Sequence, residues 1–206
     1  MINPTPQELK RIYQWAVLTP MERHDYVLRA MKELPDDTNK HKASLYQYLL
    51  KKTGIHYWKT KGKYLAEIDN YSDEMLRQPW KYFGSSNPYS DSIKARDAFM
   101  RFNGIGRKTA SMMANFCLGT KFAVLDTHVV QWMKKKGLLG PMYEIHSNKN
   151  YDFVEEIYLD YCKFEGIDPV DLDFIIWKNG AKRKTFQLET GFPEEDWKTI
   201  QNEGSA

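Results

Sequence analysis

Cysteine is scarce in this chain: only two of its 206 residues are cysteines, Cys117 and Cys162. Two thiols are too few for a four-thiolate iron–sulfur cluster or zinc site, and they exclude a scaffold of several disulfides. The five histidines stand at positions 24, 41, 56, 128 and 146, which is not a metal-ligand spacing. We therefore expect neither a structural metal nor an iron–sulfur cluster.

Long apolar runs are also missing. No run of apolar residues approaches the length that crosses a bilayer. The N-terminal sequence MINPTPQELKRIY lacks the apolar stretch of a secretory signal. These two absences predict a protein without a membrane partner, located inside the cell in the cytoplasm or nucleoid.

Strand patterns are almost absent, whereas helix signals are frequent. The best strand candidate, FAVLD (122–126), is too short and isolated to organise a sheet. TPQE (5–8) and TPME (19–22) each place threonine at an N-cap, proline at the first helical position and glutamate at the third. Apolar residues then recur at helical spacing. Further helices are expected over 43–52, 73–82, 91–102, 107–117, 127–136, 150–164 and 169–178. The fold class is all-α, with roughly nine or ten short helices.

Acidic residues are missing from one long stretch of a chain whose net charge is only +3. Residues 40–63 contain seven lysines and no acid, interleaved with Tyr46, Tyr48, Tyr57 and Trp58. Further basic clusters are Arg107–Lys108, Lys134–Lys136 and Lys182–Lys184, and each cluster taken alone is equally well explained as a solvated face. Together with the aromatics, they fit a surface that follows a phosphate backbone. The modest net charge favours a monomer.

The stretch NGIG (103–106) separates two helical patterns, IKARDAFMRF and RKTASMMANFC. Four residues are enough only for a tight hairpin, so the order is helix–hairpin–helix. Glycine permits positive φ and removes side chains that would hold a ligand away from the backbone. Free amides at the start of the second helix, together with its dipole, favour an anion such as a DNA phosphate. The alternative is a plain connecting turn with a glycine C-cap.

VLDTHV (124–129) follows the hairpin, with Asp126 lying 18 residues after Lys108. Together, GIGRKTA and LDTHV resemble the helix–hairpin–helix DNA glycosylases of the endonuclease III superfamily, whose hairpin reads approximately LPGVGRKTA and is followed by VDTH. The matching block covers about 30 residues. Asn103 stands where that family more often has proline, and Phe102 where it has leucine.

The resemblance implies roles for individual residues and a partner, double-stranded DNA that contains a damaged base. Lys108 would be the amine nucleophile and Asp126 the catalytic carboxylate. The DNA-binding residues would be those of the hairpin and the first turn after it: Asn103, Gly104, Ile105, Gly106, Arg107 and Thr109. No organic cofactor is implied, although a monovalent cation on the hairpin carbonyls is compatible with the family.

The resemblance also implies two helical lobes with the active site in the cleft between them. The expected lobes are 20–120, which ends in the hairpin motif, and 1–19 combined with 121–206. An amine that attacks near neutral pH must first lose its proton, which requires destabilising the ammonium by about 3–5 kcal/mol. A helix N-terminus supplies only ~0.3–1 kcal/mol. We therefore expect Lys108 at the floor of the cleft, with Asp126 close to the sugar site but not locked onto the amine.

A lysine at this position favours a bifunctional enzyme, because the Schiff base that it forms with the sugar permits elimination of the 3′ phosphate. Two alternatives stay open: a glycosylase that never forms the imine, and a non-catalytic DNA-binding module. If the site is not catalytic, Lys108 is a solvated lysine on a helix and Asp126 is the N-cap of the helix that follows. The capping role of Asp126 is also compatible with catalysis. His128 is expected to make a local structural hydrogen bond.

The chain lacks the four-cysteine motif of the cluster-containing members of that superfamily. Its segment DLDFIIWKNGAK (171–182) resembles the corresponding segment of cluster-free 8-oxoguanine DNA glycosylase/AP lyases. The expected substrate is therefore 8-oxoguanine, with oxidised pyrimidines, then uracil or mismatched thymine, as alternatives. The target base must leave the duplex to be cut. The sequence does not select the residue that stacks on it among the available aromatics, which are Tyr57, Trp58, Trp80, Phe83, Trp132 and Trp177.

Overall fold

The computed structural model describes residues 4–37, 39–82 and 88–181, and within them the chain is all-helical, as predicted. The described elements are α1 (Pro6–Leu18), α2 (His24–Glu33), α3 (Ala43–Lys52), α4 (Trp58–Ile68), α5 (Asp73–Leu76), α6 (Gln78–Lys81), α7 (Pro88–Phe99), α8 (Arg107–Leu118), α9 (Thr127–Lys135), α10 (Asn148–Glu165) and α11 (Pro169–Ala181). No helix among them is long and apolar enough to cross a bilayer. The same residues contain no group of histidines, cysteines or acids able to hold a metal ion.

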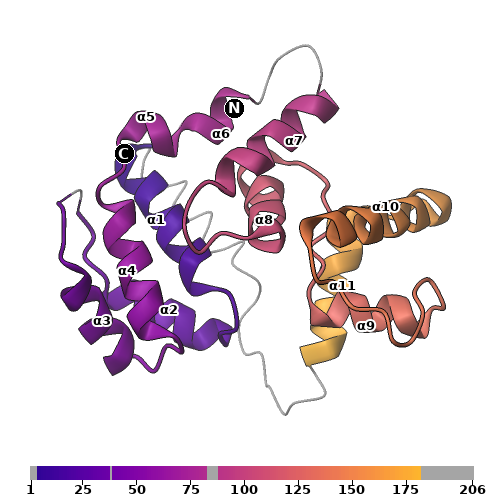
Figure 1. Ribbon diagram of the computed structural model, residues 1–206, viewed down its shortest axis with the longest axis horizontal. Helices are drawn as coiled ribbons and strands as arrows, with labels where there is room; N and C mark the ends of the chain where they lie inside the picture. The colour runs from indigo at the N-terminus through magenta and orange to yellow at the C-terminus, as the bar shows by residue number, and fades with distance from the viewer. Residues whose placement is uncertain (1–3, 38, 83–87, 182–206) are drawn as a thin grey trace.

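Two hydrophobic cores divide the chain between Phe122 and Ala123. Helices α1 to α8 surround the first core, and α9, α10 and α11 surround the second. In Figure 1 these three helices form a separate group beside the larger bundle, with α8 on the side of the bundle nearest to them. The fold therefore has two helical lobes, and the chain crosses from one to the other just before Asp126.

The N-terminal helix packs in a different lobe from the one expected. Residues 1–19 were assigned with the C-terminal helices, but α1 contacts α2, α4 and α5 (Figure 1) and contributes Leu9, Ile12 and Tyr13 to the first core. The Tyr13 ring lies 4.4 Å from that of Phe102. A buried ion pair of 2.8 Å between Lys10 and Asp69 also ties α1 to the end of α4. These contacts place α1 within the bundle that carries the hairpin.

The second capping pattern, TPME, does not start a helix. Helix α2 begins at His24, five residues after Thr19, and its N-cap is Arg23 and not the threonine that the pattern predicted. The Glu22 carboxylate is instead bound by the buried ammonium of Lys61 at 2.8 Å. Met21 adopts the left-handed conformation with φ 62°, which interrupts the helical path. A distant ion pair has therefore overridden a local helix signal.

The segment FAVLD (122–126) is extended but pairs with no strand in the described part of the chain. Side chains satisfy its backbone instead. The Phe122 amide donates to Asn115 Oδ1 at 2.8 Å, and the Ala123 amide to Glu155 Oε1 at 3.1 Å. The Tyr151 hydroxyl accepts from the Leu125 amide at 3.0 Å and donates to the Ala123 carbonyl at 2.7 Å. The approach to Asp126 is thus held mainly by α10.

Candidate active site

The hairpin has the backbone geometry that its glycines predict. Gly104 has φ +88°, a conformation that other residues rarely adopt. A Cβ atom there would lie 2.6 Å from Tyr64 Cδ2, so glycine is also required for space. The turn closes with a hydrogen bond of 3.1 Å from the Ile105 amide to the Phe102 carbonyl. Gly106 is the N-cap of α8 and provides no side-chain cap.

The remaining residues expected at the DNA differ in what they can offer. Asn103 is exposed, and its amide group donates to Glu67 Oε2 at 2.8 Å. Ile105 and Thr109 are buried at 4% exposure each, so only their backbone groups are available to a ligand. An anion at this hairpin would therefore meet backbone amides at the uncapped start of α8, where the helix dipole also favours it.

Arg107 is already engaged within the protein. Its guanidinium donates to Asp97 Oδ1 at 2.7 Å and to both carboxylate oxygens of Asp152 at 2.6 Å. Asp97 belongs to α7 in the first lobe and Asp152 to α10 in the second. The side chain is only 13% exposed. This arrangement favours a structural link between the lobes over the DNA contact expected for Arg107.

Lys108, the next residue, is half-buried in the first turn of α8. Among the described residues, no carboxylate forms a salt bridge with its ammonium. Asp126 is the N-cap of α9, and its Oδ1 accepts from the amides of His128 and Val129 at 2.8 Å each. The capping role expected for Asp126 is confirmed, and His128 takes part in it through its backbone amide. The two candidate catalytic groups are therefore not locked together.

A third group, the Asp173 carboxyl on α11, connects these two electrostatically. Its pKa is raised to about 7, chiefly because burial removes water from the charged form. The negative charge of Asp126 raises this pKa further, and the positive charge of Lys108 lowers it. Lys108 and Asp126 belong to different lobes, yet both act on one partly buried carboxyl. The structure thus brings the lysine and the two acids into a single electrostatic cluster.

A profile of a known protein family matches this chain over residues 7–167, and its description is 8-oxoguanine DNA glycosylase. The chain belongs to this family. The matched range contains the hairpin, Lys108 and Asp126 and ends before α11.

Individual members of the family are similar over different shares of their length. An 8-oxoguanine DNA glycosylase/AP lyase of Fusobacterium nucleatum is 24% identical over 181 residues, which cover 86% of this chain and 75% of that protein. One from Thermoplasma acidophilum is 38% identical over 74 residues, 36% of this chain and only 35% of that protein.

Solved structures show the same fold. The 8-oxoguanine DNA glycosylase of Thermotoga maritima matches with a TM-score of 0.69 at 24% identity, over 84% of this chain and 79% of that one. The Methanocaldococcus jannaschii 8-oxoguanine glycosylase/lyase, solved with a 15mer DNA containing 8-oxoguanine, matches with a TM-score of 0.72 at 19% identity. That match covers 85% of this chain and 81% of the other.

Within this family fold, the aromatic residues that the sequence left as alternatives have different surroundings. Trp80 packs edge-on against Phe99 at 5.4 Å, and Trp132 against Tyr161 at 5.2 Å. The ammonium groups of Lys59 and Lys51 lie 5.3 and 5.6 Å from the centre of the Trp58 ring. Phe83 lies outside the described residues. Trp177 is partly buried on α11, one helical turn after Asp173.

Among the aromatics of that set that the structure describes, Tyr57 is the most exposed. It is 60% exposed and adopts the left-handed conformation with φ 54°, at the N-cap of α4. Such a backbone is uncommon for a bulky side chain and often marks a functional position. Tyr57 shares with Gly104 of the hairpin a largely apolar hollow of about 180 Å³. The exposed tyrosine is therefore a neighbour of the expected phosphate site.

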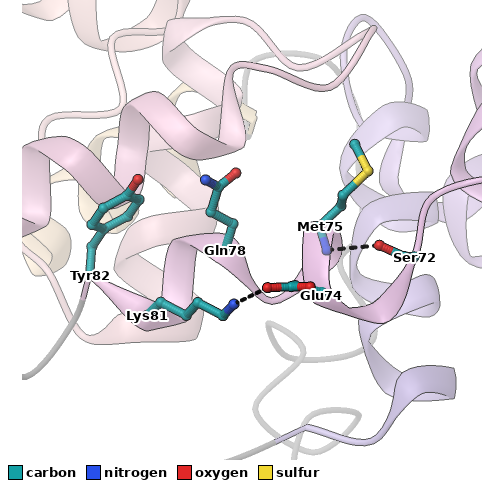
Figure 2. Close-up of a pocket in the computed structure, with 6 residues that line it drawn as sticks. All are labelled: Ser72, Glu74, Met75, Gln78, Lys81 and Tyr82. Atoms are coloured by element: carbon teal, nitrogen blue, oxygen red, sulfur yellow. Dashed lines mark hydrogen bonds and ion pairs between the residues drawn. The ribbon is translucent and has the colours of Figure 1, made fainter.

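A larger surface hollow of about 310 Å³ lies elsewhere on the first lobe, between α5 and α6 (Figure 2). Lys81 and Glu74 are joined at its edge by an ion pair of 2.8 Å. Its lining contains neither Lys108 nor either of the two acids, Asp126 and Asp173. This hollow is not part of the candidate active site.

Sequence reasoning missed Asp173 as a member of the site. The segment DLDFIIWKNGAK contains two aspartates, and nothing in its local pattern distinguishes Asp173 from the exposed Asp171. The spacing of Asp173 and Trp177 by four residues was the available signal, because it places both on one face of a helix. The partners of Asp173 come from α8 and α9 and are visible only in the fold.

Proposed function

We propose that this protein is a bifunctional DNA glycosylase and AP lyase that excises 8-oxoguanine from duplex DNA and nicks the strand. The names of its relatives support the substrate and both activities. The observation that carries the proposal is the cluster of Lys108, Asp126 and Asp173, in which groups from both lobes act on one carboxyl.

In the proposed reaction, the neutral Lys108 amine attacks C1′ of the flipped nucleotide, and the C1′–N9 bond breaks as the base departs with its electron pair and gains a proton. Positive charge develops at the sugar in this step, and the Asp126 carboxylate stabilises it. The amine nitrogen then loses one proton, and the sugar ring opens as the C1′–O4′ bond breaks and O4′ gains a proton, which gives a protonated imine that keeps one N–H. Loss of a C2′ proton then expels the 3′ phosphate and nicks the strand.

We assign to Asp173 the transfer of the proton that the Lys108 ammonium must lose. A carboxyl with a pKa of about 7 is half ionised at neutral pH, which suits a group that accepts and returns protons there. In its charged form Asp173 also helps to hold the ammonium in place before the reaction. Asp126 is occupied by two amides and is therefore better suited to steady charge stabilisation.

DNA would lie across the hairpin and the basic stretch that follows α2. Backbone amides around Gly104 and Gly106 would bind a phosphate, and the exposed lysines Lys51, Lys59 and Lys63 would follow the backbone beyond it. Tyr57, exposed beside the hairpin, is suited to fill the gap left by the flipped base.

The cation and the oligomeric state stay predictions. The carbonyl oxygens of Asn103 and Ile105 accept no hydrogen bond in the described part of the chain, so they are available to a monovalent cation. We continue to expect a monomer that works inside the cell.

Incision of defined duplexes tests the proposal. Each duplex carries one lesion: 8-oxoguanine, an oxidised pyrimidine, uracil or a mismatched thymine. We expect a nick at 8-oxoguanine without alkali treatment, loss of that nick in Lys108→Gln, and its retention in Lys163→Gln, which removes an exposed lysine that the proposal does not place at the DNA.

Other outcomes identify the alternatives. A nick that appears only after alkali would indicate a glycosylase without lyase activity. Cleavage confined to another lesion would change the substrate. Unaltered DNA binding with no cleavage of any duplex would indicate a non-catalytic module.

A further inference from the structure

Two buried or half-buried arginines cross from the first lobe to one face of α10. Arg107 binds Asp152, as described above, and Arg96 binds Glu155 Oε2 at 2.6 Å with both side chains less than 10% exposed. Arg96 also lies 3.8 Å from Asp152 and stacks on the Phe122 ring at 3.9 Å. A buried charge is retained only with good partners, and α10 supplies them.

The same face of α10 contacts residues that adjoin both candidate catalytic groups in the chain. Asp152 binds the residue that directly precedes Lys108 in α8. Glu155 accepts from the Ala123 amide, and Tyr151 bonds to the amide of Leu125, the residue before Asp126. One rigid helix therefore sets the start of α8 and the segment that delivers Asp126 to its position.

We propose that Arg107 is a positioning residue: its bond to Asp152 fixes the Lys108 amine relative to Asp126, and it does not contact DNA. The inference rests on the proposed function, because it concerns the geometry of that reaction. A lysine nucleophile needs its nitrogen within about 3–3.5 Å of the carbon that it attacks, and a displacement of about 1 Å costs about 100-fold in rate. Breaking the bond would let the start of α8 shift against α9.

The two partners of Arg107 provide a matched pair of variants. Asp152 is 46% exposed and lies in the other lobe, whereas Asp97 is 53% exposed and lies in the same lobe as Arg107. Asp152→Asn removes the charge that Arg107 binds in the second lobe, whereas Asp97→Asn removes a similar charge within the first lobe, and the Arg96–Glu155 pair is present in both variants. Both positions are exposed enough for the variants to fold, which a melting curve checks.

The assay measures single-turnover cleavage of an 8-oxoguanine duplex and, separately, DNA affinity as a function of salt. We expect Asp152→Asn and Arg107→Gln to slow cleavage by about 10- to 100-fold with unchanged affinity. Asp97→Asn should stay within about threefold of the wild type, and Arg107→Lys, which keeps one charged bond, should recover part of the rate.

A phosphate contact by Arg107 gives the opposite pattern. Arg107→Gln would then weaken DNA binding and reduce the slope of log affinity against log salt by about 0.9, with the cleavage rate of bound DNA unchanged. That result would overturn the inference, as would equal rates for Asp152→Asn and Asp97→Asn. If wild-type protein does not cleave the duplex at all, the proposed function itself fails, which is a separate outcome.

Discussion

Replacing Asp173 by asparagine should make the protein more stable at alkaline pH and less active. In the folded protein the pKa of Asp173 is raised from 3.8 to about 7, so ionising this carboxyl is less favourable in the folded protein than in the unfolded chain. A shift of about three units corresponds to about 4 kcal/mol, and partial exposure of the side chain reduces this to about 2–4 kcal/mol. Asparagine has the same shape without the charge.

The pH dependence follows from the direction of the shift. Below the unfolded pKa, the carboxyl is neutral in both states, and the wild type and Asp173→Asn should be equally stable. As pH rises from the unfolded pKa of 3.8 to the folded pKa of about 7, the wild type loses stability and the variant does not, and above that range the difference stays constant. At about pH 8 the variant should melt about 5–10 °C higher.

Thermal melts of both proteins from about pH 4 to pH 8 measure this difference. Asp171→Asn is the control, since Asp171 is exposed two residues earlier on the same helix and should leave the pH dependence unchanged. The same Asp173→Asn protein should cleave an 8-oxoguanine duplex about 100-fold more slowly, because it has lost the proton acceptor. A stability difference that does not change with pH, or a less stable variant at pH 8, would refute the reasoning.

Three further predictions concern the surroundings of the site. Gly104→Ala should lower the melting temperature and weaken DNA binding, because the φ of +88° and the close contact of the new Cβ atom with Tyr64 cost about 1–3 kcal/mol. Gly137 also has positive φ but no atom near the position of a Cβ, so Gly137→Ala should lower stability less. Equal losses of stability in the two variants would contradict this prediction. Tyr57→Ala should slow excision without changing thermal stability. Tyr48→Ala, at a similarly exposed tyrosine, should change neither the excision rate nor the stability, and identical kinetics for the two variants would exclude a gap-filling role for Tyr57. Lys61→Met should destabilise the protein by about 3–5 kcal/mol in urea melts, because it removes the buried ammonium and leaves the Glu22 carboxylate with only the exposed His56 ring as a partner. Lys63→Met should change stability by less than about 0.5 kcal/mol, and an equally small effect of Lys61→Met would contradict the prediction.

Local signals in the sequence were sufficient for much of the fold. The box formed by Thr5 and Glu8 caps α1 as predicted, and Asp168 caps α11 by accepting from the Val170 amide at 2.9 Å. Ranges read from helical periodicity, such as 43–52, agree with the structure because their apolar faces and their ends are encoded within a few neighbouring residues. The 73–82 range is instead two short helices, α5 and α6.

Helix α4 was missed because its beginning carries no local signal. Its N-cap, Tyr57, has a left-handed backbone and makes no side-chain cap, and Gly62 interrupts its pattern. That glycine has a reason elsewhere in the chain: a Cβ atom there would lie 2.6 Å from Gln47 Cγ on α3. Contacts between α3 and α4 decide this helix, and they cannot be read from its own residues.

In the candidate site, too, some residues could be predicted from local sequence motifs and others only from the fold. Lys108 and Asp126 were nominated because two short motifs carry them, although their catalytic roles stay predictions. Asp173 became a candidate only in the fold, where two charges from other helices act on its carboxyl. The engagement of Arg107 by Asp152, 45 residues away in the chain, was equally unreadable from the hairpin motif.

Borohydride reduction tests the central claim, that the Lys108 amine attacks the sugar of a damaged nucleotide. Protein and a duplex with a single 8-oxoguanine are mixed with borohydride, and the covalent complex is digested and sequenced by mass spectrometry. The account predicts one cross-linked peptide, joined through Lys108, and no complex with Lys108→Gln protein. A cross-link through another lysine, or an equal yield from Lys108→Gln, would contradict it.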